Sequence, residues 1–111
     1  MMNEVDNREG LDGELKKNSR VLVLFYASWC PYCRSFVPVF KEETANFKLG
    51  VILQVLLDDY DNPLWDDYDI GAVPTVIFFE KSKVTKRLDG EFGVGLKASQ
   101  LVQWLKDSNL L

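Results

Sequence analysis

Residues 21–33 read VLVLFYASWCPYC and hold the two features that decide the fold. Residues 21–26 form a continuous apolar run, which is typical of a strand covered on both faces of a sheet. Pro31 favours the first turn of a helix, because its missing N–H would be unpaired there anyway. The segment therefore predicts a buried strand that leads into a helix, with Cys30 at the helix cap and Cys33 one turn later.

Two cysteines three positions apart at a helix N-terminus indicate redox chemistry. Residues with this spacing face each other with Cβ atoms about 5–6 Å apart, which permits a disulfide after a modest adjustment. The helix N-terminus favours a thiolate at Cys30, and in such motifs the pKa of the thiol falls to about 3.5–7.5. We expect an exposed Cys30 thiolate to attack a substrate disulfide and a more buried Cys33 to resolve the mixed disulfide.

The same spacing has two other interpretations, half of a zinc site and an inert buried pair. Zinc prefers four ligands, and the chain has two cysteines and no histidine, so a zinc site would need carboxylates or a second chain. The lack of histidine also excludes Ser-His-Asp and Cys-His catalysis. We therefore expect redox activity without a metal or another cofactor.

Length and composition predict one globular domain over residues 1–111. The chain is 47% hydrophobic and shows neither an internal repeat nor a linker. Its net charge of −4 does not favour a nucleic-acid partner. The sequence contains no apolar stretch of membrane-spanning length, and its polar first twenty residues do not resemble a signal peptide. We expect a monomeric, cytoplasmic protein that binds no membrane.

Apolar spacing along the chain predicts an α/β protein. Residues 1–10 are expected to be frayed, and a short helix follows up to Asn18. Strands are expected at 21–26, 51–57, 73–79 and 84–88, with helices at 31–48, 64–68 and 97–108. A kink is expected at Pro38. Alternation of strands with helices implies parallel pairing, whereas the last two strands form an antiparallel hairpin, so the central sheet is mixed.

Three further motifs carry a resemblance to a known family. Pro38 follows the second cysteine by five residues, residues 61–63 read DNP, and residues 73–75 read VPT. With these motifs and the order of its elements, the chain resembles thioredoxin over nearly its whole length. The resemblance implies a thioredoxin fold, with helices on both faces of the sheet and a C-terminal hairpin plus helix. It also implies a thiol-disulfide oxidoreductase that reduces protein disulfides, is recycled by a separate reductase, and serves electron transport and cell redox homeostasis.

The resemblance also assigns roles around the cysteines. Pro74 would be cis and pack against the active-site disulfide, and the backbone of Val73 would pair with a substrate strand. Trp29 would be the exposed tryptophan beside the nucleophile, while Pro31 and Tyr32 support the site between the cysteines. The alternatives are a proline that simply starts a strand and a tryptophan that only packs.

Three positions depart from the family pattern. Leu24 stands six residues before Cys30, where thioredoxins usually carry a buried aspartate that assists proton removal from the second thiol, so Cys33 should be activated more slowly. The Pro-Tyr dipeptide between the cysteines is the glutaredoxin pairing, and we expect a reduction potential less reducing than about −270 mV. Residues 91–94 lengthen the loop before the last helix, and they either shape partner choice or are a neutral insertion.

An acidic segment follows the strand at 51–57. Its spacing does not match a calcium-binding loop, because the central glycine and the final glutamate are missing. We expect a solvated acidic surface that favours basic partners. The segment comprises Asp58, Asp59, Asp61, Asp66, Asp67 and Asp69.

Two other functions remain open at this point. One is a glutaredoxin-like enzyme recycled by glutathione, which the Pro-Tyr dipeptide favours. The other is a binding module in which a thioredoxin-like groove holds a partner and the cysteines do no chemistry. An oxidase or isomerase role would be decided by the measured reduction potential.

Overall fold

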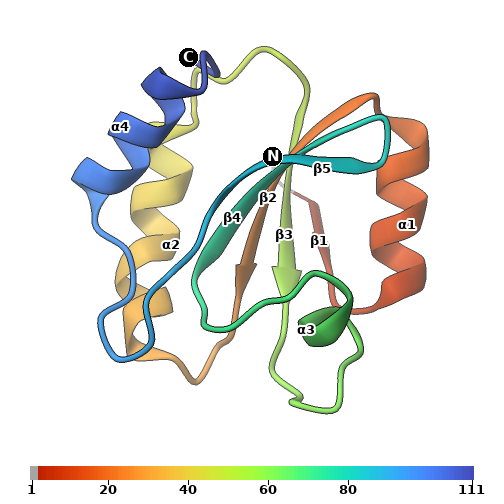
Figure 1. Cartoon of the computed structure of the whole chain (residues 1–111), viewed down its shortest axis with the longest axis vertical. Helices are drawn as coiled ribbons and strands as arrows, with labels where there is room; N and C mark the ends of the chain where they lie inside the picture. Colours follow the sequence, from red (N-terminus) through yellow and green to blue (C-terminus); the bar gives the residue numbers. More distant parts are fainter. Residues whose placement is uncertain (1–2) are drawn as a thin grey trace.

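A five-stranded mixed sheet forms the centre of the structure, a computed structural model that describes residues 3–111 (Figure 1). The strand order is β1-β3-β2-β4-β5. β1, β3 and β2 run parallel, β4 is antiparallel to β2, and β5 is antiparallel to β4. The mixed sheet and the C-terminal hairpin are thus confirmed. The strands are β1 (Asn3–Val5), β2 (Arg20–Tyr26), β3 (Val51–Leu56), β4 (Thr75–Glu80) and β5 (Lys83–Leu88).

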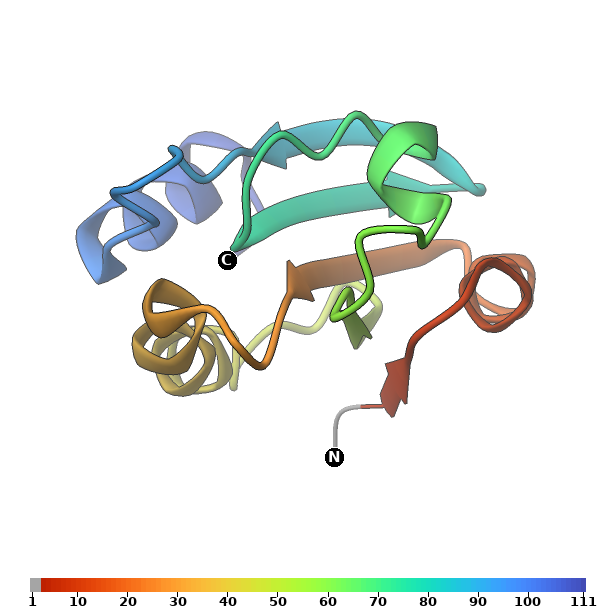
Figure 2. The same ribbon diagram turned by 90° about the horizontal axis from the view of Figure 1, so that it is seen from below.

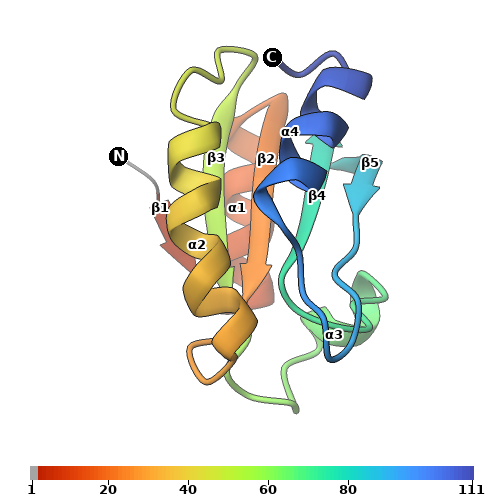
Figure 3. The same cartoon turned by 90° about the vertical axis from the view of Figure 1, so that its left-hand side faces the viewer.

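Helices cover both faces of the sheet, as expected. Figure 3 shows α2 (Pro31–Glu43) and α4 (Ala98–Asp107) side by side on one face. α1 (Arg8–Lys17) and α3 (Leu64–Asp67) lie on the other face. The buried side chains divide accordingly into two clusters, one containing residues of α1 and α3 and the other containing residues of α2 and α4.

The central strand β2 separates the two clusters. Its residues 21–25 are fully buried, and alternate side chains enter opposite clusters, Val23 on the α1 side and Leu24 on the α2 side. This arrangement explains the unbroken apolar run, because neither face of the strand meets water. Burial of each such side chain stabilises the fold by about 1.5–3 kcal/mol.

The N-terminal segment is more ordered than the sequence predicts. Residues 1–10 were expected to be frayed, but residues 3–5 form β1, which pairs parallel with β3, and α1 begins at Arg8. Asn7 caps α1, since its Oδ1 accepts a hydrogen bond from the Gly10 N–H at 2.7 Å. Val5 packs against the α1-side cluster. Residues 1 and 2, which share that expectation, lie outside the described part of the chain.

The direction of β4 corrects another expectation. The alternating pattern predicted a parallel strand, but β4 runs antiparallel to β2. A parallel crossover must carry the chain back along the sheet, and β3, with six residues, is about 20 Å long. α3 has only four residues and spans about 6 Å. The chain therefore turns back at the end of the sheet where β3 finishes.

The helix that follows the cysteines is shorter than expected. It ends at Glu43 instead of residue 48, and Thr44 closes it by donating from its Oγ1 and its N–H to the Phe40 carbonyl at 2.6 and 3.0 Å. Pro38 lies inside this helix, which continues for five residues beyond it. Phe47 nevertheless reaches the α2-side cluster from the following loop.

Three connections meet at the carboxyl ends of β2 and β3. They are residues 27–30 before α2, residues 57–74 around α3, and residues 89–97 before α4, and Figure 2 looks onto this end of the molecule. The predicted site residues all lie in these connections or in the first turn of α2. Between residues 3 and 111, no helix has both the length and the apolar character needed to cross a membrane.

Candidate active site

The two cysteines lie together at the N-terminus of α2. Cys30 is the N-cap residue, and its Sγ accepts a hydrogen bond from the Cys33 N–H at 3.3 Å. The Cys30 thiol also donates to the Val73 carbonyl at 3.7 Å. Both cysteines are unbridged, and 5% of Cys30 and 1% of Cys33 are exposed. Cys33 is the more buried, as expected, whereas Cys30, which lines a groove, is less accessible than the sequence predicts.

The two thiols meet different electrostatic surroundings. Burial raises the pKa of the Cys33 thiol to about 12, and the nearby Cys30 and Asp58 act in the same direction, against a backbone hydrogen bond from Ala27. Cys33 therefore keeps its proton at neutral pH. Cys30 instead receives an N–H from the first turn of the helix, and such a donor stabilises negative charge on sulfur.

Leu24 occupies the position of the missing aspartate. It is fully buried and packs in the α2-side cluster with Phe36 and Phe40. The carboxylate that influences the pKa of Cys33 is instead Asp58, which follows β3. Asp58 accepts hydrogen bonds from the N–H and the Oγ of Ser28, each at 2.6 Å. Sequence reasoning assigned Asp58 only to the acidic surface, although its place directly after a buried strand was a readable signal.

Trp29 is 43% exposed, as the resemblance implies. Its indole Nε1 donates to the Asp58 carbonyl at 2.9 Å, which fixes the ring beside Cys30. The ring packs against Tyr60 with centroids 5.2 Å apart, and Tyr60 stacks on Trp65 at 5.4 Å. Tyr60 and Trp65 were not predicted as site residues. Residues 58–69 hold three aromatic residues among six aspartates, and this was the available signal.

The Val73–Pro74 peptide bond is cis, which confirms the geometry implied by the resemblance. Thr75 holds this segment, because its Oγ1 donates to the Ala72 carbonyl at 2.7 Å and accepts from the Gly90 N–H at 3.3 Å. A Cβ atom at Gly90 would lie 2.1 Å from the Pro74 carbonyl oxygen. Only glycine therefore permits this close approach of the two backbones.

Tyr32 joins the first turn of α2 to the loop before α4. Its hydroxyl donates to the Gly93 carbonyl at 2.6 Å. Gly95 lies against the Tyr32 ring and has a φ of 79°, so a side chain there would both clash and strain the backbone. Residues 91–95 form a small hairpin, closed by a bridge between Glu91 and Gly95. Tyr32, the second residue between the cysteines, therefore has a structural role, because it holds this hairpin against the first turn of α2.

These residues line one groove of about 230 Å³. It brings together the predicted Trp29, Cys30, Pro31, Tyr32 and Val73, and it adds three aromatic residues that the sequence analysis did not place there. Pro74, which follows Val73, and the buried Cys33 do not line the groove. The added residues are Tyr60, Trp65 and Phe92.

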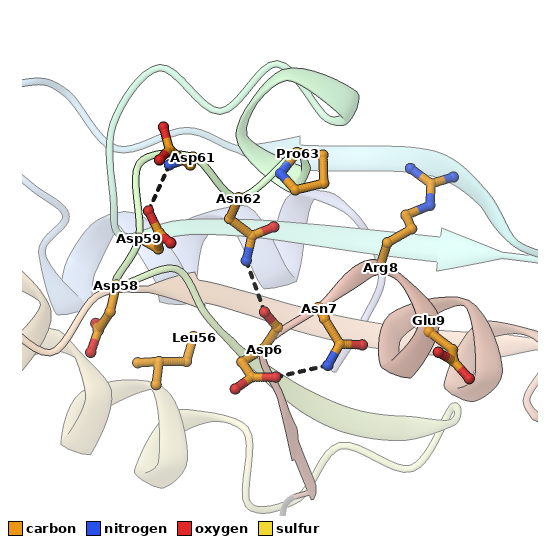
Figure 4. A pocket seen from close by; sticks show the side chains of 10 residues that line it. All are labelled: Asp6, Asn7, Arg8, Glu9, Leu56, Asp58, Asp59, Asp61, Asn62 and Pro63. Atoms are coloured by element: carbon orange, nitrogen blue, oxygen red, sulfur yellow. Dashed lines mark hydrogen bonds between the residues drawn. The ribbon is translucent and has the colours of Figure 1, made fainter.

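The six aspartates of the acidic segment do not line this groove, although Tyr60 and Trp65 of the same segment do. All six aspartates are exposed, which confirms a solvated acidic surface. A larger, open hollow of about 610 Å³ lies on this side of the molecule. Among the residues that line it, Asp59 accepts a hydrogen bond from the Asp61 N–H at 2.8 Å, and Asn62 donates one to the Asp6 carbonyl (Figure 4). Within the described residues, no three cysteine or acidic side chains are grouped so that they would hold a metal ion.

Comparison with known proteins identifies the family. The family model described as Thioredoxin matches residues 3–107. The chain belongs to the thioredoxin family. It is 35% identical over 89 residues to a thioredoxin of Mycoplasmoides gallisepticum, covering 80% of this chain and 88% of that protein. It is 38% identical over 89 residues to the chloroplastic thioredoxin Y2 of Arabidopsis thaliana, covering 79% of this chain and 50% of that protein.

Protein disulfide isomerases are also among the relatives. Protein disulfide-isomerase A5 of Bos taurus is 28% identical over 107 residues, which cover 93% of this chain but only 20% of that protein. The relatives and the paired cysteines support the predicted thiol-disulfide oxidoreductase activity.

Solved structures confirm the fold. The oxidised thioredoxin of Plasmodium falciparum has a TM-score of 0.79 at 22% identity, with 100% of both chains covered. The reduced thioredoxin pre-protein of Schistosoma mansoni has a TM-score of 0.74 at 24% identity, covering 96% of this chain and 96% of that one.

Proposed function

We propose that this protein reduces protein disulfides by dithiol exchange, with Cys30 as the attacking thiolate and Cys33 as the resolving thiol. The observation that carries the proposal is the hydrogen bond from the Cys33 N–H to Cys30 Sγ at the start of α2. It favours negative charge at Cys30, while burial keeps the proton on Cys33. The two sulfur atoms therefore have distinct roles before a substrate arrives.

The reaction proceeds in two exchanges. Cys30 Sγ attacks one sulfur of the substrate disulfide, a mixed disulfide forms, and the other substrate sulfur leaves as a thiolate that takes up a proton. Cys33 then loses its proton and attacks Cys30 Sγ, which releases the second substrate thiolate. The substrate gains two electrons and two protons, and the protein is left with a Cys30–Cys33 disulfide.

The segment before β4 would hold the substrate. The Val73 carbonyl lies 3.7 Å from Cys30 Sγ, so a substrate strand paired with the Val73 backbone would bring its disulfide to the nucleophile. Pro74 next to it has no N–H and leaves that side of the strand open. Trp29, Pro31 and Tyr32 would form the remaining walls around the reacting sulfur.

Trapping experiments test the two roles. Cys33→Ser should accumulate mixed disulfides with proteins of a cell extract, and Cys30→Ser should abolish both trapping and the reduction of insulin disulfides. The low exposure of Cys30 favours the alternative of a binding module. A Cys30→Ser protein that keeps the biological function, together with a Cys33→Ser protein that traps nothing, would establish that alternative.

The electron donor is proposed to be a thioredoxin reductase and not glutathione. The groove beside Cys30 is lined by uncharged residues and offers no cation to the carboxylates of glutathione. Recovery of the reduced protein should therefore be fast with the reductase and slow with glutathione plus its own reductase. A titration should give a reduction potential above about −270 mV because of the Pro-Tyr dipeptide.

The proposed setting is the cytoplasm, where a single-domain, monomeric reductant would serve electron transport and cell redox homeostasis. Sedimentation should give the mass of one chain, 12.8 kDa. Cell fractionation should recover the protein with cytoplasmic markers. Recovery in an organelle or a secreted fraction would contradict this location and leave the chemistry unaffected.

A further inference from the structure

We propose that the groove beside Cys30 selects polypeptide disulfides whose cysteine is flanked by large apolar side chains and, beyond them, by cations. The inference rests on the proposed function and specifies its substrate class. The residues that determine this specificity are Tyr60 and Phe92, which line the groove from two different connections, residues 57–74 and residues 89–97.

The lining of the groove is apolar and small. None of its eleven residues is Asp, Glu, Lys or Arg, although these four types make up 27% of the chain. Its volume of about 230 Å³ falls below the roughly 300–1,000 Å³ of sites that enclose a small-molecule ligand. One apolar side chain of a bound polypeptide fits this space better than a free metabolite does.

One wall is a stack of three aromatic rings, Trp29, Tyr60 and Trp65. The indole N–H of Trp29 donates to the Asp58 carbonyl, and that of Trp65 donates to the Asp59 carbonyl at 3.0 Å. Because both polar groups are satisfied by the protein, the rings offer apolar surface to a ligand. Tyr60 lies between them and is 72% exposed.

A second wall is formed by the hairpin of residues 91–95, which contributes Phe92 and Gly93 to the lining. Phe92 at its tip is 89% exposed. The hairpin is fixed by the Gly95 N–H on the Glu91 carbonyl at 2.9 Å and by the Tyr32 hydroxyl on the Gly93 carbonyl. An exposed phenylalanine on a fixed backbone suits recognition, because little conformational freedom is lost when it binds.

Acidic residues near the groove indicate which charge the bound polypeptide carries beyond its apolar residues. Asp59 and Asp61 flank Tyr60 in sequence, and Glu91 precedes Phe92. All three acids are exposed, so both walls continue into negative surface. A polypeptide with lysine or arginine beyond its apolar residues complements this pattern, whereas an acidic polypeptide is repelled.

Three disulfide-linked peptide dimers test the proposal, with chain sequences Lys-Phe-Cys-Phe-Lys, Lys-Ser-Cys-Ser-Lys and Glu-Phe-Cys-Phe-Glu. The reduced protein should consume the first dimer with a kcat/KM at least about tenfold above that of the second, since an apolar contact of this size discriminates by about 10–200-fold. The third should react more slowly than the first, and added salt should narrow this gap. Equal rates for the first two dimers would overturn the inference.

Substitutions in the groove test whether Phe92 and Tyr60 determine the preference for the phenylalanine peptide. Phe92→Ser and Tyr60→Ser should each lower the rate ratio of the phenylalanine to the serine peptide, by a factor on the order of 3 or more. Val94→Ser changes an exposed residue of the same hairpin that does not line the groove, and it should keep the wild-type ratio. An unchanged ratio in both wall variants would overturn the inference while peptide reduction upholds the proposed function. If no dimer is reduced, the proposed function itself fails and this inference with it.

Discussion

Substitution of Gly90 by alanine should lower the rate of disulfide reduction far more than it lowers the stability of the fold. In Gly90→Ala the new Cβ would lie 2.1 Å from the Pro74 carbonyl oxygen, and approaches below 3.0 Å are essentially never seen in proteins. The two backbones must therefore move apart by about 0.9 Å. This shift displaces the Val73–Pro74 segment, to which we propose that the substrate binds.

The expected magnitudes follow from this displacement. Forcing an extra methyl group into a tight backbone contact costs about 1–3 kcal/mol of unfolding free energy. For a domain of this size, each kcal/mol lowers the melting temperature by about 4–8 °C. A misplacement of about 1 Å at the reacting centre lowers the rate about 100-fold. Activity should thus fall much further than the loss of stability explains at a temperature where the variant is folded.

Urea unfolding and insulin disulfide reduction at room temperature measure the two effects. The matched control is Gly13→Ala in α1, where a Cβ would meet nothing within 4 Å. That variant should gain about 0.5–1 kcal/mol from reduced backbone entropy and keep its rate. A Gly90→Ala protein with wild-type rate and stability would refute the reasoning, and so would equal losses in both variants.

Three further substitutions test the site and the core. Burial raises the pKa of Cys33, so its contribution to the unfolding free energy of the reduced protein is complete below about pH 9 and declines towards pH 12. In urea titrations this decline should be less steep in Cys33→Ala by about 1.4 kcal/mol per pH unit, while Tyr26 and Tyr68, whose pKa burial also raises, keep part of the decline above about pH 10 in both proteins. Arg87→Lys should cost about 1 kcal/mol in urea, because one guanidinium bridges the Tyr68 and Asp69 carbonyls and an ammonium does not span both. Phe40→Ala should cost about 3–5 kcal/mol; a loss below about 1 kcal/mol in urea would contradict its place in the core.

Local chemistry made the first turn of α2 readable from the sequence. Pro31 favours the first position of a helix, which makes the cysteine before it the cap. The apolar run before it required a strand with both faces covered, which β2 shows. These predictions succeeded because each depends on residues within one turn or one strand.

Features that depend on distant partners were not readable in the same way. β1 has only three residues, and it forms because these residues pair with the edge of β3. The local sequence of this polar segment therefore does not predict a strand. The burial of Cys30 depends on Val73, 43 positions away, and on the aromatic rings of the acidic loop. The direction of β4 has a different origin: α3, with four residues, is too short for a parallel crossover, and the rule that alternating helices and strands pair in parallel takes no account of helix length.

The departure at Leu24 and the burial of Cys33 together shift the slow step of the proposed reaction. Attack by Cys30 is assisted by the Cys33 N–H, which stabilises the negative charge that develops on Cys30 Sγ. Resolution needs a base, since burial holds the proton on Cys33 and Leu24 supplies no acceptor. The substrate thiolate released in the first exchange is then a suitable base, provided that the substrate stays in place. A groove that binds the residues beside the substrate cysteine retains the substrate after the first exchange. Substrate binding therefore also promotes proton transfer from Cys33.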